Sequence, residues 1–140
     1  MSELFLDAAY AIALSSPKDQ FHDRAIHLAN QLEATQTTLV TTRAVLLEIG
    51  NALSKIQYRD AAVKLLIALE ADPNVKIIPL SEEVYLRALK LYRERQDKEW
   101  GLVDCVSFVV MQERNIQDAL TTDVHFRQAG FRVLLREDML

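Results

Sequence analysis

Short apolar segments alternate along this chain with longer segments whose apolar residues recur at helical spacing. The short segments have the length and the β-branched or apolar composition of strands, and they are residues 3–7, 38–42, 75–80, 119–122 and 131–135. Strands separated by helices form parallel sheets whose two faces are covered by those helices. The sequence therefore predicts one α/β domain over residues 1–140, with three layers (α/β/α) and a central, mostly parallel sheet of about five strands.

Capping residues and apolar stripes predict where the helices lie. Ser16 followed by Pro17 is typical of a helix start, and Ser81 before two acids predicts another. Residues 103–114 are apolar nearly all round, which predicts a buried central helix that contains Cys105. The full set of expected helical features is a helix beginning at residue 17, a stripe formed by Leu46, Ile49, Leu53 and Ile56, and helices over residues 60–71, 82–95, 103–114 and 124–129.

Composition excludes several classes of protein. The single cysteine, Cys105, excludes an internal disulfide and a multi-cysteine metal site. No apolar run approaches the roughly 18 residues that span a membrane. Residues 4–14 carry Asp7 in the middle and are preceded by Glu3 with no Lys or Arg, which is the opposite of a secretory signal. We therefore expect a cytoplasmic protein with no membrane partner. The net charge of −4 argues against binding nucleic acid by bulk electrostatics, but it allows brief contact with phosphates through metal ions.

Four acidic residues occupy positions that this fold would bring together. Asp7 ends the first predicted strand, Asp123 follows the fourth, Asp104 opens the buried helix, and Glu48 lies beside an apolar stripe. Taken singly, each has an ordinary explanation as a turn residue, a helix cap or a solvated flank. In an open parallel sheet, however, ligand sites lie beyond the carboxyl ends of the strands. We therefore expect all four carboxylates at one edge of the sheet.

Such a cluster needs compensating positive charge. Two like charges about 4 Å apart repel by about 1 kcal/mol in water and by several times that in a partly screened site. Carboxylate oxygens suit Mg²⁺ or Mn²⁺ better than Zn²⁺. Hydrolysis of a phosphodiester is the chemistry that best matches such a site.

Four acidic blocks resemble the motifs of PIN-domain ribonucleases in order, spacing and flanking residues, and they are residues 4–10 (LFLDAAY), 46–53 (LLEIGNAL), 102–108 (LVDCVSF) and 119–126 (ALTTDVHF). The last two blocks look most like the VapC-type toxins of bacterial toxin–antitoxin pairs. The resemblance implies that Asp7, Glu48, Asp104 and Asp123 bind Mg²⁺ or Mn²⁺ and cleave RNA.

The resemblance also implies separate roles for these residues. It makes Asp7 and Asp104 direct metal ligands, Asp123 a ligand directly or through water, and Glu48 a residue that orients a water or holds a second ion. Ser107 and Thr122 match positions where the family often has a hydroxyl, and we expect them to hydrogen-bond the acidic residues.

Partners and target are implied only at the level of the family. Toxins of this type usually pair with a small antitoxin that lies across the active-site groove, and they commonly form homodimers. Their targets include transfer, ribosomal and messenger RNA, and this sequence does not choose among them. An alternative function is that of a PIN domain that acts mainly as an RNA- or protein-binding module with little cleavage.

Several other residues are candidates for contact with RNA. They are Arg43, Lys55, Lys98, His125 and Arg127. Trp100 has two open explanations, which are stacking on a base and packing against the edge of the sheet. A phosphoacceptor signalling domain is rejected, because its acceptor Asp after the third strand and its Lys after the fifth are missing here.

Overall fold

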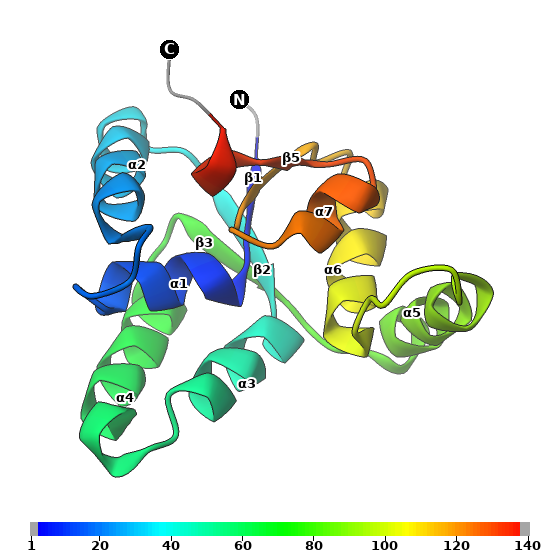
Figure 1. Ribbon diagram of the computed structural model, residues 1–140, viewed down its shortest axis with the longest axis horizontal. Helices are drawn as coiled ribbons and strands as arrows, with labels where there is room; N and C mark the ends of the chain where they lie inside the picture. Colours follow the sequence, from blue (N-terminus) through cyan, green and yellow to red (C-terminus); the bar gives the residue numbers. More distant parts are fainter. Residues whose placement is uncertain (1–2, 138–140) are drawn as a thin grey trace.

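A computed structural model describes residues 3–137, and its centre is a five-stranded parallel sheet (Figure 1). The strand order is β3-β2-β1-β4-β5. All four strand pairings are parallel, with Phe5 of β1 between Val40 of β2 and Ala119 of β4. The strands are β1 Leu4–Leu6, β2 Leu39–Thr42, β3 Val75–Ile78, β4 Asp118–Leu120 and β5 Arg132–Val133. The predicted α/β architecture is confirmed.

Helices pack on both sides of this sheet, as Figure 1 shows with α1, α2 and α4 on one side and α5 and α6 on the other. The helices are α1 Ala8–Ser15, α2 His22–Thr35, α3 Arg43–Ala52, α4 Ile56–Ala71, α5 Glu82–Glu94, α6 Leu102–Glu113 and α7 Val124–Gln128, followed by the 3₁₀ turn η1 Leu134–Arg136. Within residues 3–137, we find no helix with both the length and the apolarity that crossing a membrane requires.

The core is centred on α6, as its sequence predicts. Every residue from Cys105 to Met111 is buried. Phe108 meets Trp100, Phe126 and Phe131 with ring centroids 5.0, 5.0 and 5.7 Å apart. These contacts fix the position of α6, whose first turn carries Asp104, against α7 and the loop before α6.

The first crossover differs from the prediction. Helix α1 is not among the predicted helices, and Ser16 ends it instead of starting the next helix. Residues 17–21 form turns, in which the Asp19 carboxylate accepts a hydrogen bond from the Phe21 N–H (2.8 Å), and α2 begins at His22. The apolar residues of α1 face several sides, so the segment lacks the one-sided stripe from which a helix is recognised.

The stripe predicted to end at Ile56 is also wrong. Helix α3 stops at Ala52, and Ile56 begins α4 with 83% of its surface exposed. In α4, which starts earlier than predicted, Val63 and Ile67 are also exposed, whereas Ala62 is buried. The apolar residues that the sequence suggests for a single helix therefore belong to two helices, because the chain turns at residues 53–55.

Candidate active site

Two of the four acids follow neighbouring strands: Asp7 comes directly after β1, and Asp123 comes three residues after the end of β4. Strands β1 and β4 are parallel partners, and the Asp7 N–H donates to the Leu120 carbonyl oxygen (3.2 Å). Asp7 is the residue before α1, and Asp123 is the residue before α7, where its Oδ1 accepts from the His125 N–H (2.8 Å). The parallel pairing therefore places both carboxylates at the same edge of the sheet.

Thr121 connects these two acids. Its hydroxyl donates a hydrogen bond to Asp7 Oδ2 (2.7 Å), and its Oγ1 accepts one from the Asp123 N–H (3.0 Å). Thr121 is fully buried and Asp7 is only 5% exposed. Sequence reasoning selects the neighbouring Thr122 instead. Both threonines follow β4, which ends at Leu120, and only the three-dimensional structure shows that Thr121 is the one that contacts Asp7.

Asp104 and His125 complete the exposed part of the site. Asp104, in the first turn of α6, accepts the Gly101 N–H on Oδ2 (3.1 Å). The same oxygen lies 3.2 Å from His125 Nδ1, which is also 3.4 Å from Asp123 Oδ1. Asp104, Asp123 and His125 each place one ligand atom within 4.8 Å of the others. His125, which the sequence suggests only for contact with RNA, thus lies between two of the acids.

Burial and mutual repulsion raise the pKa values of the acids. Burial is the main cause at Asp7, whose pKa rises to about 6, and the charges of Asp104 and Asp123 add to it while the Thr121 hydroxyl opposes it. Burial also raises the pKa of Glu48 to about 7, with further contributions from Asp7, Asp104 and Asp123. The pKa of Asp104 is raised first by burial and then by Asp123. The acids therefore destabilise one another when all are ionised.

The four carboxylates line one groove of about 530 Å³ at the sheet edge. Thr122, His125 and Arg136 also line it, and Arg136 is the one Lys or Arg side chain among the described residues that do so. The guanidinium of Arg136 donates to the Thr122 carbonyl oxygen. Carboxylate oxygens are the ligands that Mg²⁺ and Mn²⁺ prefer, and such an ion would relieve the repulsion.

Comparison with known proteins agrees with this geometry. The sequence profile of the PIN domain matches residues 4–132 of the chain. The chain belongs to the PIN domain family. The family predicted from the four acidic blocks is confirmed.

Individual relatives of this PIN domain are VapC proteins. It is 28% identical over 129 residues to the 23S rRNA-specific endonuclease VapC20 of Mycobacterium tuberculosis, covering 91% of this chain and 95% of that one. The crystal structure of VapC20, described as a sarcin–ricin loop cleaving toxin, matches with a TM-score of 0.80 at 26% identity and the same two coverages. The predicted likeness to VapC-type toxins is therefore confirmed.

More distant solved structures share the fold. VapBC2 from Rickettsia felis, bound to a DNA fragment from its promoter, matches with a TM-score of 0.69 at 16% identity, covering 94% of this chain and 96% of that one. FitAcB from Neisseria gonorrhoeae matches with a TM-score of 0.66 at 17% identity, covering 93% and 95%.

Other predicted site residues lie in different surroundings. Ser107 is buried one turn after Asp104, but its hydroxyl donates to the Val103 carbonyl oxygen of its own helix (3.2 Å). Thr122 lines the groove. Of the two explanations for Trp100, packing applies: its side chain is 6% exposed, and its Nε1 donates to Gln128 Oε1 of α7 (3.0 Å).

The candidate RNA-contacting cations lie outside the acidic groove. Arg43 pairs with Glu70 of α4, Lys55 precedes α4, and Arg127 is exposed on α7. Lys98 lines a second hollow beside α5. The cation in the groove, Arg136, is not among the residues that the sequence suggests. It follows the last strand, and only the tertiary structure brings it to the groove.

Proposed function

We propose that residues 1–140 form a single PIN domain. We propose further that it is a metal-dependent endoribonuclease, which hydrolyses RNA phosphodiester bonds, and that it is the toxin of a toxin–antitoxin pair. The observation that carries the proposal is the convergence of Asp7, Glu48, Asp104 and Asp123 on one groove at the sheet edge. The likeness to VapC20 supports RNA as the substrate, with a ribosomal RNA loop as the first target to test. Such a target places its action in the cytoplasm.

The proposed metal ligands are Asp7, Asp104 and Asp123, with Glu48 beside them. A bound Mg²⁺ or Mn²⁺ would activate water and neutralise charge that develops on the phosphate. The chain's own contribution is to orient these groups. Thr121 holds the Asp7 carboxylate, the Gly101 N–H holds Asp104, and the His125 N–H holds Asp123. Because these carboxylates are already held in place, less conformational entropy is lost when they bind a metal ion.

Glu48 is proposed to act on water rather than to bind as a primary ligand. It is half-buried on α3, and it lines the groove from a different element than the aspartates do. Burial and the neighbouring acids raise its pKa to about 7 while no ion is bound, and a bound cation would lower this pKa and leave a carboxylate that can orient a water. Ser107 and Thr122 are proposed to support the acidic residues indirectly, through the helix and loop that carry them.

Partners follow from the same family. We propose a small antitoxin that covers the acidic groove, and a homodimer as the assembled toxin. The VapBC structures that share this fold support a toxin–antitoxin pairing.

Cleavage of structured RNA by the purified protein tests the proposed function. Wild type, Asp104→Asn and the surface variant Asp118→Asn are incubated with ribosomal and transfer RNA in Mn²⁺ or in EDTA. We expect cleavage by wild type and Asp118→Asn in Mn²⁺ only, and at least about 100-fold slower cleavage by Asp104→Asn. Binding of RNA without cleavage under every condition would instead support the alternative of a binding module.

A further inference from the structure

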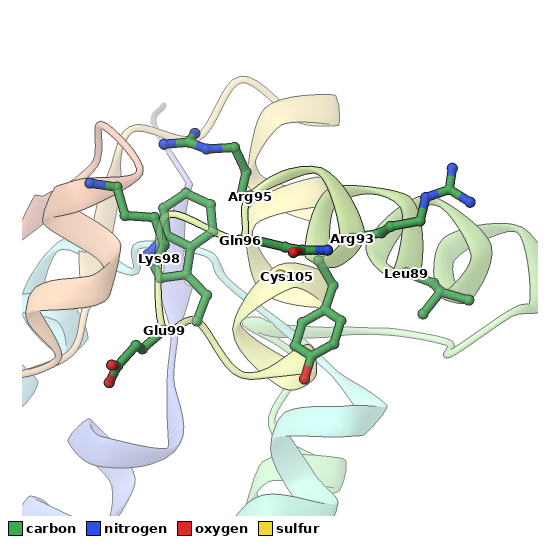
Figure 2. A pocket seen from close by; sticks show the side chains of 9 residues that line it. Leu89, Arg93, Arg95, Gln96, Lys98, Glu99 and Cys105 are labelled. Atoms are coloured by element: carbon green, nitrogen blue, oxygen red, sulfur yellow. The ribbon is translucent and has the colours of Figure 1, made fainter.

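A second hollow, of about 670 Å³, lies beside the C-terminal turns of α5 (Figure 2). Its walls come from α5, from the loop that joins α5 to α6, and from Cys105 of α6. The residues that matter for the argument are Leu89, Tyr92, Arg93, Arg95, Lys98 and Trp100. None of them lines the acidic groove.

The hollow is basic in an acidic protein. Arg93, Arg95 and Lys98 line it together with one acid, Glu99, whereas the whole chain carries a net charge of −4. Figure 2 shows Arg93 on one side of the hollow and Arg95 and Lys98 on the other. Because Arg93 extends away from Arg95 and Lys98 (Figure 2), the hollow offers separated cations to an extended polyanion rather than enclosing a single anion.

The three cations differ in how far they are already neutralised. Arg95 donates to both carboxylate oxygens of Asp97 (3.0 and 3.1 Å), and its guanidinium carbon lies 4.8 Å from the ring centroid of Trp100. Arg93 and Lys98 take part in no ion pair within the part of the chain that the structure describes. The charge of Arg95 is therefore already paired with Asp97, and its position is held by Asp97 and Trp100. Arg93 and Lys98 carry the positive charge that is available to a ligand.

An exposed aromatic ring completes the chemistry of the hollow. Tyr92 is 47% exposed and Leu89 is 39% exposed, and both line the hollow beside the cations. Proteins that bind single-stranded nucleic acid commonly combine two features. Cations contact the phosphate backbone, and an aromatic side chain beside them stacks on a base. An acidic peptide would use the cations but would leave the ring without a partner.

A short segment joins this hollow to the acidic groove. Lys98 and Trp100 line the hollow, and the next residue, Gly101, donates its N–H to Asp104 in the groove. The groove itself carries four carboxylates, which repel a phosphate backbone. Arg136 is the one Lys or Arg side chain that lines the groove among the described residues, so most of the affinity for the flanking strand has to come from cations outside it.

We infer that the hollow lined by Tyr92, Arg93 and Lys98 is a second RNA-binding site, which holds the single strand next to the bond that is cut in the acidic groove. The inference rests on the proposed function for the identity of the ligand. It assigns Arg93 and Lys98 to phosphates and Tyr92 to one base.

Binding in EDTA tests this site apart from cleavage. Fluorescence anisotropy of a labelled single-stranded oligoribonucleotide of mixed sequence is measured at several salt concentrations. We expect Arg93→Glu and Lys98→Glu each to weaken binding about 10-fold and to reduce the salt slope by about 0.7 for each phosphate that the variant no longer neutralises. Lys64→Glu, on exposed α4, changes the net charge by the same amount and is the matched control, which should bind like wild type.

The aromatic contact has its own pair of variants. Tyr92→Ala should weaken binding roughly 10-fold, whereas Tyr92→Phe keeps a ring for stacking and should bind like wild type. In Mn²⁺, Arg93→Glu and Lys98→Glu should raise KM for RNA and leave kcat at saturating RNA unchanged. Equal weakening by Lys64→Glu, or no RNA binding by wild type in EDTA, would overturn the inference.

The two proposals fail in distinguishable ways. If wild type binds RNA through the hollow but cuts none in Mn²⁺, the proposed nuclease function fails and the binding site stands. If wild type cleaves RNA while the hollow variants keep wild-type affinity and KM, the binding site fails and the nuclease stands.

Discussion

The hydroxyl of Thr121 lies 2.7 Å from Asp7 Oδ2 and joins the ends of two adjacent parallel strands. Both side chains are buried, so this bond is shielded from water. The same Oγ1 accepts the Asp123 N–H (3.0 Å), so a single side chain sets the positions of two acids. The geometry of the acidic groove therefore depends on a residue that is not itself acidic.

Replacing Thr121 tests this dependence. Thr121→Val keeps the shape of the side chain but leaves the Asp7 carboxylate without its donor, so we expect cleavage to fall about 10- to 100-fold and metal affinity to weaken. The free energy of unfolding should fall by about 1–3 kcal/mol. Thr35→Val, at the exposed end of α2, is the control, and cleavage rates with Mn²⁺ titrations compare the two. An equal loss in both variants would show that the Thr121 bond has no special role.

Removing the charge of Asp7 should stabilise the metal-free protein. Because its pKa is near 6 in the folded state, ionisation of Asp7 costs about 2–3 kcal/mol at pH 8 relative to the unfolded chain. We expect Asp7→Asn to raise the melting temperature in EDTA at pH 8, to raise it by about half as much at pH 5 and hardly at all below about pH 4, and to abolish cleavage. A lower melting temperature at pH 8 would contradict the repulsion that we infer.

The metal-free wild type should lose stability as the pH rises. The folded-state pKa values of Asp7 and Glu48, about 6 and about 7, lie above their ordinary values, so the folded state binds protons more tightly than the unfolded state does. The stabilisation is complete below about pH 4 and is lost as the pH rises through 6 and 7. Chemical denaturation in EDTA between pH 5 and 8 measures this slope, which should flatten in the Asp7→Asn, Glu48→Gln double variant.

Divalent metal should reverse this loss. An ion that binds only the folded protein stabilises it by about 2.7 kcal/mol at a concentration 100 times its dissociation constant. We expect millimolar Mn²⁺ to raise the melting temperature of wild type at pH 8, and the gain to shrink at pH 5 because protons compete for the carboxylates. Asp104→Asn should reduce the gain, whereas Asp118→Asn should retain it. A wild-type melting temperature that is independent of Mn²⁺ would contradict the metal site.

Trp100 should behave as a core residue. It packs edge-on against Phe108 with ring centroids 5.0 Å apart, and Gln128 accepts its indole N–H. Trp100→Phe should therefore lower the free energy of unfolding by about 1–2 kcal/mol, because it removes this hydrogen bond and reduces the packed volume, with RNA affinity in EDTA unchanged. A loss of affinity without a loss of stability would instead indicate contact with a base.

The sequence predicts most of the elements because their signals are local. Five short apolar segments separated by helical stripes are enough to indicate a parallel sheet, and capping by Ser81 identifies the start of α5. The failures occur where local signals are ambiguous. Helix α1 has apolar residues on several sides, and a stripe that continues across the turn at residues 53–55 resembles a single helix.

Sequence alone determined the identity and order of the four acids, and with them the family. Only the tertiary structure decided which neighbours surround those acids. The pairing of β1 with β4 selects Thr121 over Thr122, and the packing of α6 and α7 brings His125 between Asp104 and Asp123. The physical reason is that spacing along a strand or helix is set by the local backbone, whereas contacts across strands and helices depend on long-range pairing and packing.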